Sequence, residues 1–306
     1  MARRRGSCGP YIKNHARSRA TVESGKRIAV CAAATQNGRI MNSLSPRHVF
    51  RPELEIRFAG LRFHPLTTDQ AVAALAARPA DLPFDILITP NAEHAWLRRQ
   101  DAEFDQISGR AWLSTNDSRV LRKAAALGGV DLGFAPGCHI VERLFHEVIA
   151  PDDPITVIGG DASAIADLAG QFGLTRVAHH NPPMGFIHDA DAVRAAVDFV
   201  AAHPGRFVFV AMGPPQSEKF CQRIIDDGRA TGLGLCIGSS ITTLTGRTPS
   251  APRWMEDRGL VWLYRLAREP GRLWRRYLVR GLYGLGLGLI DSVAFRLGLK
   301  SARPRD

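Results

Sequence analysis

The chain has 306 residues, of which 45% are hydrophobic, and a net charge of +11. This length allows one large domain or two small ones with a substantial core. The five cysteines are scattered and form no C-x-x-C pair, which argues against a disulfide framework or a zinc site and favours a reducing compartment. No run of 18 uninterrupted apolar residues is present, so the composition predicts no clear transmembrane helix.

The positive charge is concentrated at the two ends of the chain. Residues 1–51 hold eleven Lys and Arg against one acid, and residues 247–306 hold thirteen against five, so the middle is net negative. Basic ends of this kind can contact nucleic acid, anionic lipid or a polyanionic substrate. We interpret residues 1–52 as a basic, disordered extension without a signal peptide, within which Met41 is an alternative start.

Strand and helix patterns alternate along residues 53–246. A hairpin is expected first, followed by an Ala-rich helix, at 54–58, 61–63 and 71–77. Further strands are predicted at 85–89, 111–114, 155–158, 176–179, 207–210 and 234–237. Further helices are predicted at 92–100, 118–126, 162–172, 190–202 and 219–229. This rhythm predicts an α/β fold whose parallel sheet has helices on both faces.

Polar side chains follow two of these strands. Thr89 and Asn91 can bind a sugar or orient a base, although Asn91 also suits the N-cap of the helix over 92–100. Asp117 lies at the next junction, where it can deprotonate an attacking hydroxyl or contribute to a helix cap. Thr89, Asp117 and Gln216 all fall at the carboxyl edge of the predicted sheet, where ligands bind in such folds.

The stretch from Phe207 to Glu218 is the most informative in the chain. A buried strand breaks at Gly213-Pro214-Pro215 because two consecutive prolines cannot extend a central strand. Gln216 and Glu218 follow this break directly. We therefore predict that the stretch forms one wall of a ligand site, with Gly213, Pro215, Gln216 and Glu218 facing the ligand.

Small residues end two other strands. Gly159 and Gly160 precede a helix and can let backbone N–H groups approach a diphosphate. Gly238 follows the last strand, where it permits either a close ligand approach or an ordinary tight turn. His179 and His180 are adjacent on a strand, so their side chains point to opposite faces and predict no shared metal ion.

The segment after residue 246 has a different texture, rich in Arg, Trp, Leu and Tyr, and we interpret 247–306 as a basic α-helical appendage. In a helix over 272–280, four apolar residues share one face: Leu273, Trp274, Tyr277 and Leu278. The arginines fall on another face. Such a helix can lie on a membrane with its arginines on lipid phosphates, or pack on the core with a solvated basic face.

Several motifs together resemble the WecG/TagA/CpsF glycosyltransferases, bacterial enzymes of cell-surface polysaccharide assembly. The resemblance covers roughly residues 53–280. It is carried by Thr89-x-Asn91, Gly159-Gly160, Gly213-x-Pro215-Gln216-x-Glu218, Ala251-Pro252-Arg253-Trp254-Met255, Gly259-Leu260-x-Trp262-Leu263-Tyr264-Arg265-Leu266, Glu269-Pro270 and Arg272-Leu273-x-Arg275-Arg276-Tyr277. It implies a Rossmann-like core of the type called GT-E.

The resemblance also implies an activity. Such enzymes transfer a sugar with inversion, without a metal or cofactor, from a UDP-sugar to a polyprenyl-diphosphate-linked sugar, on the cytoplasmic face of the membrane. Asp117 occupies the place of the family's proposed base, which is followed by glycine in the family and by Ser118 here. The lipid diphosphate is implied to bind four arginines of the appendage: Arg265, Arg272, Arg275 and Arg276.

Departures from the family pattern point to a different donor sugar. The usual Asp after the last strand is Thr242, and the usual Arg before Ala-Pro is Ser250. We expect a hexosyl or N-acetylhexosaminyl donor in exopolysaccharide synthesis, with N-acetylmannosamine transfer as the alternative. Two alternative functions of other classes are an inactive scaffold of a polysaccharide complex and a nucleic-acid-binding protein with basic arms. We expect a peripheral membrane enzyme that binds no nucleic acid, and homo-oligomerisation is left open.

Overall fold

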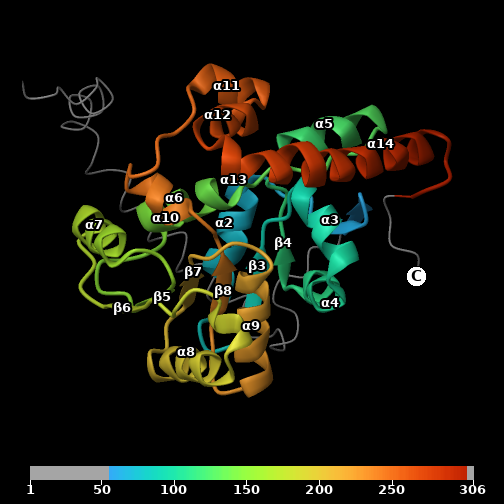
Figure 1. The fold of residues 1–306 in the computed structure, drawn as a ribbon. Coiled ribbons are helices and arrows are strands. Elements are labelled where there is room, and N and C mark those ends of the chain that lie inside the picture. The colour runs from blue at the N-terminus through green and yellow to red at the C-terminus, as the bar shows by residue number, and fades with distance from the viewer. Residues whose placement is uncertain (1–54, 302–306) are drawn as a thin grey trace, which may run out of the picture. The chain divides into compact units, whose positions relative to one another are not determined.

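The computed structural model describes residues 55–301, so the expected extension over 1–52 lies outside the described residues. Its centre is a six-stranded sheet in the order β4-β3-β8-β7-β5-β6, in which every neighbouring pair is parallel (Figure 1). The strands are β3 (Asp85–Ile88), β4 (Leu113–Ser114), β5 (Ile155–Ile158), β6 (Val177–His180), β7 (Phe207–Val210) and β8 (Leu233–Cys236). All six were predicted, with ends that differ by at most two residues.

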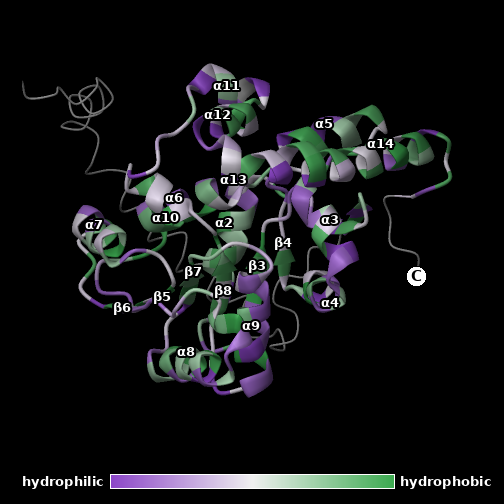
Figure 2. Cartoon of the chain, in the orientation of Figure 1, coloured by the Kyte–Doolittle hydropathy of each residue, from purple (hydrophilic) through white to green (hydrophobic). Residues whose placement is uncertain are grey.

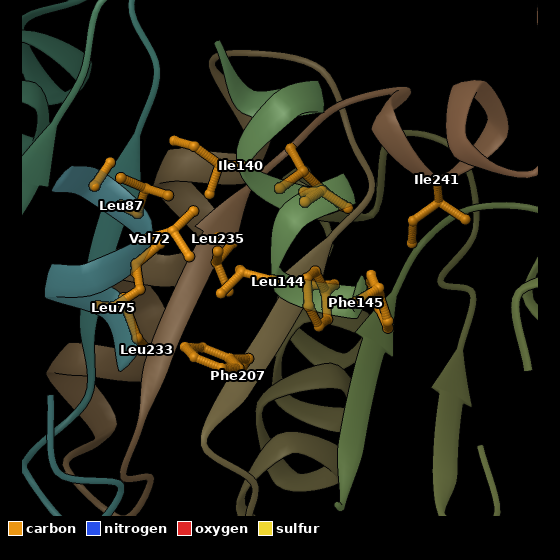
Figure 3. Close-up of a cluster of buried hydrophobic side chains, with 14 of the residues drawn as sticks. Val72, Leu75, Leu87, Ile140, Leu144, Phe145, Phe207, Leu233, Leu235 and Ile241 are labelled. Carbon is orange, nitrogen blue, oxygen red and sulfur yellow. The ribbon is translucent and has the colours of Figure 1, made fainter. Parts of the chain in front are cut away.

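Helices cover both faces of this sheet, as the sequence predicts. Successive side chains of a strand point to opposite faces, so Phe207 and Phe209 pack into one core and Val208 and Val210 into another. The first core lies under α2 (Thr68–Ala77), α6 (Gly137–Glu147), α7 (Ala162–Phe172) and α10 (Ser240–Leu244), and Figure 3 shows part of it. The second lies under α4 (Ala102–Arg110), α8 (Ala190–Ala202) and α9 (Gln216–Asp227), with the short η3 (Phe186–His188) beside it.

A third apolar cluster lies beyond β4. The hairpin of β1 (Ile56–Phe58) and β2 (Leu61–Phe63) is antiparallel, as predicted, and buries its phenylalanines. The hairpin packs with α3 (Ala92–Gln100), α5 (Arg119–Leu127) and the C-terminal α14 (Leu282–Arg296). The carboxylate of Asp291 on α14 accepts a hydrogen bond from the Ala59 backbone N–H at 2.8 Å. The C-terminal helix is therefore fastened to the hairpin by a buried polar contact as well as by apolar packing.

The C-terminal segment is helical, as expected of the appendage. It contains α11 (Arg253–Arg258), α12 (Val261–Arg268), α13 (Pro270–Trp274) and the π-helical segment η4 (Arg275–Gly281), which leads into α14. Figure 2 shows hydrophobic residues recurring along α14 and α5. The division into a core over 53–246 and an appendage over 247–306 stays a prediction.

One continuous helix, Pro270–Arg296, is long and apolar enough to cross a membrane by length and composition alone. The prediction of no clear transmembrane helix rested on uninterrupted apolar runs, which Asp291 and the arginines break. In the structure this helix packs against α3 and α5, with Gly284, Gly288, Asp291 and Ser292 buried. Because a packed helix passes the same composition test, the finding is weak evidence for a membrane span.

Within 53–246 the structure adds three α-helices that the sequence reading missed, α4, α6 and the short α10, and shifts a fourth, α9. Asp101 caps α4 by accepting from the Phe104 N–H, and α6 buries residues at helical spacing, such as Ile140 and Leu144. The expected loop at Gln216 to Glu218 is instead the first turn of α9. A helix can begin directly after Pro215, since the first helical positions need no backbone donor and proline is tolerated there.

Candidate active site

The residues predicted to bind ligand gather at the carboxyl edge of the sheet. Thr89 follows β3, Asp117 follows β4, Gly159 follows β5, Gly213 follows β7 and Gly238 follows β8. The strands are parallel, so their carboxyl ends lie along one edge, which is where ligands bind in open α/β sheets.

Asp117 occupies a partly buried position at this edge. Its backbone N–H donates to the Pro90 carbonyl at 3.1 Å, and its side chain accepts a hydrogen bond from Asn91. Burial raises the pKa of the Asp117 carboxyl above its ordinary value. The positive charges of Arg265 and Arg276 act in the opposite direction. The position thus combines a carboxylate whose basicity is raised with cations that keep it ionisable, which suits a general base.

Asn91 joins a helix cap to this carboxylate. Its Oδ1 accepts from the Glu93 backbone N–H at 3.0 Å, so the predicted N-cap of α3 is present. The same side chain also hydrogen-bonds to Asp117. The two interpretations of Asn91 that the sequence left open, as a helix cap and as an orienting group, are therefore compatible. Asp117 does not cap the following helix. The N-cap of α5 is its neighbour Ser118, whose Oγ accepts from the Leu121 N–H at 3.2 Å.

The four candidate arginines of the appendage fall into two groups. Arg265 and Arg276 lie near Asp117. Arg272 is exposed and pairs with Glu269 at 2.6 Å, and Arg275 is exposed beside the Trp274 ring. Only the first two are thus brought to the carboxylate. Among the described side chains, Arg265 has no carboxylate oxygen within 4 Å, so its guanidinium has bidentate capacity to offer an anion.

The side-chain orientation of 272–280 differs from both predicted alternatives. Glu93, whose surface is 7% exposed, forms an ion pair with Arg276 Nε at 2.7 Å and accepts a hydrogen bond from Arg280 Nη1 at 2.9 Å. These two arginines therefore face the protein, while Trp274 and Leu278 are exposed. The reason is electrostatic, since a buried carboxylate on α3 recruits the cations inward and leaves apolar residues on the outer surface.

A model of the glycosyl transferase WecG/TagA/CpsF family matches residues 56–295, which is more than half of the chain. The chain belongs to this family. It is therefore a glycosyltransferase of cell-surface polysaccharide synthesis, as the resemblance implies. The match extends from the β1–β2 hairpin through the sheet and into α14, so it includes the C-terminal helices that carry Arg265 and Arg276.

In this glycosyltransferase the loops after β5 and β7 approach each other closely. Gly159 has φ +80°, and a Cβ there would lie 2.8 Å from the Cγ of Met212. The side-chain amide of Gln216, oriented to satisfy its neighbours, donates to the carbonyls of Gly213 at 3.0 Å and Pro214 at 3.2 Å. Its amide therefore braces its own turn. Gly160 also has positive φ, and Pro215 follows a cis peptide bond.

Glu218 is placed differently from its expected ligand-facing position. It is 2% exposed, and its Oε2 accepts from Ser217 Oγ at 2.8 Å. Of the adjacent histidines, His179 Nε2 lies 3.0 Å from the Gly159 carbonyl oxygen, and the His180 ring stacks on Phe199. Both histidines thus have structural contacts.

The sequence reading missed three polar residues of this family member's site. Glu93 and His94 lie in the first turn of α3. Acidic and polar residues are common at the start of a helix, so their presence there gave no separate signal of a functional site. Cys138 lies in the first turn of α6; burial, and then the charge of Asp117, raise the pKa of its thiol to about 12. Cys138 therefore remains a neutral wall of the site and is no candidate nucleophile.

The charges around Asp117 predict the pH dependence of this enzyme. A carboxylate that acts as the base must be ionised, so if Asp117 fills that role kcat/KM falls as the pH drops through its pKa, which burial raises above the ordinary value. Arg265→Ala removes the cation with the largest lowering effect, so the acidic limb should move to higher pH. Arg272→Ala is the matched control and should leave the limb in place. A limb that ignores both variants would show that Asp117 does not govern it.

Proposed function

We propose that the protein is an inverting glycosyltransferase that moves a hexosyl or N-acetylhexosaminyl group from a UDP-sugar to a polyprenyl-diphosphate-linked sugar. The observation that carries this proposal is the partly buried Asp117 carboxylate at the carboxyl edge of the sheet, with Arg265 and Arg276 beside it. A carboxylate of raised basicity can accept a proton from an acceptor hydroxyl, and the arginines can bind diphosphate oxygens.

The proposed reaction is a single displacement. Asp117 takes the proton of the acceptor hydroxyl as the hydroxyl oxygen bonds to the anomeric carbon from the face opposite UDP. The bond from the anomeric carbon to the UDP oxygen breaks, and its electron pair leaves with UDP. Arg265 and backbone N–H groups after β5 stabilise the negative charge that develops on the diphosphate. Thr89, at the end of the neighbouring strand, is proposed to contact the reacting sugars.

The remaining contacts are proposed from their places at the same edge. Backbone groups of the glycine turns are proposed to approach the donor diphosphate, and Gln216 to hold their geometry. Arg272 and Arg275 lie further out and are proposed to meet phosphates from the membrane side. Together, the residues proposed to bind the substrates or to shape their site are Asn91, Gly159, Gly160, Gly213, Pro215, Gln216, Gly238, Arg265, Arg272, Arg275 and Arg276.

A lipid-linked acceptor is supported by a hollow beside the site. A cavity of about 410 Å³ lies between α5, the α11–α12 segment and α14. Its lining combines apolar side chains such as Trp262 and Leu289 with the basic residues Arg119, Lys123 and Arg258. Arg119, which lines this hollow, follows the proposed base by two positions in the chain. A lining that combines apolar and basic side chains suits an amphiphile that carries phosphate.

The direct test incubates the purified full chain with a short-chain polyprenyl-diphosphate-linked N-acetylglucosamine. The donors are UDP-glucose, UDP-N-acetylglucosamine and UDP-N-acetylmannosamine, one at a time. Mass spectrometry of the lipid product then identifies donor and activity together. Transfer from the third donor alone would favour the N-acetylmannosaminyl alternative. Membrane binding without transfer from a broad set of UDP-sugars would favour the scaffold reading, and steeply salt-dependent DNA binding would favour the nucleic-acid reading.

Peripheral attachment to the inner face of the cell membrane is proposed from the exposed apolar side chains of the C-terminal helices. Ile290 is 65% exposed and Val293 is 59% exposed. Burying each such side chain in a lipid interface contributes about 1.5–3 kcal/mol.

We therefore expect the double variant Ile290→Glu with Val293→Glu to bind vesicles of anionic and zwitterionic phospholipid at least about 10-fold more weakly than the natural chain. Met184→Glu is the control, since Met184 is a fully exposed apolar residue in the loop before α8. Co-sedimentation measures both. Equal loss in the control, or no loss in the double variant, would contradict the assignment of this face.

A further inference from the structure

A buried carboxylate lies behind the proposed base, one step removed from it. Glu218, in the first turn of α9, is 2% exposed, and within the described residues no Lys or Arg nitrogen lies within 4 Å of it. Its Oε1 lies 3.9 Å from Nε2 of His94, which is itself 5% exposed. Taking a carboxylate out of water without a strong cation costs stability, so packing alone does not account for Glu218.

The other ring nitrogen of His94 faces Asn91. His94 Nδ1 lies 3.2 Å from the Asn91 backbone N and 3.1 Å from Asn91 Oδ1. Two neutral tautomers can satisfy these contacts. With its proton on Nε2, the ring accepts from the Asn91 N–H, and with its proton on Nδ1 it donates to Oδ1. The carboxylate of Glu218 faces Nε2 and therefore favours the tautomer that carries its proton there.

These contacts orient the side chain of Asn91. With its proton on Nε2, His94 accepts from the Asn91 backbone N–H through Nδ1 and so holds the helix cap, and in either tautomer Asn91 Oδ1 accepts from the Glu93 N–H at 3.0 Å. The amide oxygen is then committed to the helix cap, so the amide NH₂ is the group that remains for Asp117. The NH₂ group donates and the Asp117 carboxylate accepts. This hydrogen bond fixes one carboxylate oxygen and leaves the other for a substrate hydroxyl.

We propose that His94 and Glu218 are positioning residues that hold Asn91, and through it the carboxylate of Asp117, in the orientation needed for proton transfer. This inference rests on the proposed role of Asp117 as the base. The proposed role of Glu218 is compatible with its burial, since Glu218 acts through His94 and does not touch the donor sugar. This series of side-chain contacts connects α9, which follows β7, with the loop after β4.

Two substitutions separate positioning from folding. His94→Gln keeps the helix cap, because glutamine at this third helical position can accept from the Asn91 N–H as in an ordinary capping box, but it removes the ring nitrogen that faces Glu218. Glu218→Gln removes the charge and retains the shape. Each is expected to lower kcat about 10- to 100-fold, the usual loss when an orienting partner is removed, with KM changed less than about twofold.

The double variant tests whether the two residues act as one unit. If they do, His94→Gln with Glu218→Gln lowers kcat no further than the more damaging single change. Full kcat in His94→Gln, or losses that multiply in the double variant, would overturn the inference. Asp117→Asn in the same assay separates the two ideas. An active Asp117→Asn enzyme refutes the proposed base, whereas an inactive one beside a fully active His94→Gln refutes only the positioning role.

A second readout does not depend on turnover. Long-range proton–nitrogen NMR of the imidazole rings reports which nitrogen carries the proton, and the His94 signals are those that disappear in His94→Gln. The natural chain is expected to show the proton on Nε2, and Glu218→Gln is expected to populate the Nδ1-protonated form. Finding the Nδ1 proton already dominant in the natural chain, or no change in Glu218→Gln, would contradict the proposed role of the carboxylate.

Discussion

Asp117→Asn is expected to lower turnover by about 10²- to 10⁴-fold, the contribution typical of a positioned general base. Asparagine keeps the size of the side chain and its contact with Asn91, but its amide cannot take a proton from the acceptor hydroxyl. The guanidinium of Arg265 and the glycine turns remain, so binding of the proposed UDP-sugar donor should change little. The loss is therefore expected in kcat, with KM for the donor within a few-fold.

The same substitution is expected to stabilise the protein. Because burial raises the pKa of Asp117 in the folded state, ionising its carboxyl costs more free energy in the folded protein than in the unfolded chain. Asp117 thus destabilises the fold at neutral pH, and this penalty fades as the pH falls toward the ordinary Asp value, where both states are protonated. The stability gain of Asp117→Asn should accordingly be largest at neutral pH and shrink on acidification.

Chemical denaturation at two pH values, together with the transfer assay, measures both effects. Asp152→Asn is the matched control, since Asp152 is exposed in the loop before β5, at the amino end of the sheet. It should change neither kcat nor stability. An Asp117→Asn protein that is inactive because it is less stable than the natural chain would argue against a catalytic role. Turnover close to the natural level would refute the base assignment outright.

The sheet and its flanking helices were predictable because their sequences carry local signals. The run at β7 and the helix over 190–202 were predicted with the bounds that the structure shows. The same holds for α3, whose cap at Asn91 is written in the sequence. Such elements depend on hydrophobic periodicity and capping, which neighbouring residues alone determine. The gathering of Thr89 and Asp117 at one edge then followed from the parallel topology.

The contacts that complete the candidate site were not predictable in this way. Glu93 and Arg280 are separated by 187 positions, and nothing near either residue announces their pairing. The burial of Glu218 was not predictable for the same reason, because its neighbours include α3 and β8, which are distant from it in the sequence. The inward turn of Arg276 also depends on the π-helical winding of η4, which shifts side chains away from the positions that an α-helical wheel assigns.

Gly284→Ala is expected to undo the docking of the C-terminal helix. An added Cβ would lie 2.0 Å from the Ala92 carbonyl oxygen and 2.8 Å from its carbonyl carbon. Both atoms belong to the backbone of the first turn of α3, so neither can move aside as a side-chain tip could. Relief requires α14 to shift away from α3, and we expect a loss of about 1–3 kcal/mol in the free energy of unfolding, as for other overpacked contacts.

Activity should fall with the docking. Glu93, in the same turn of α3 as Ala92, holds Arg276 and Arg280, so a displaced α14 draws these arginines away from the carboxyl edge of the sheet. Gly286→Ala is the control on the same helix, since a Cβ there meets nothing within 4 Å. Alanine favours a helix over glycine, so this variant should gain about 0.5–1 kcal/mol and retain activity. Urea unfolding and the transfer assay compare the two variants, and equal behaviour would show that close contact between α14 and α3 contributes nothing to the site.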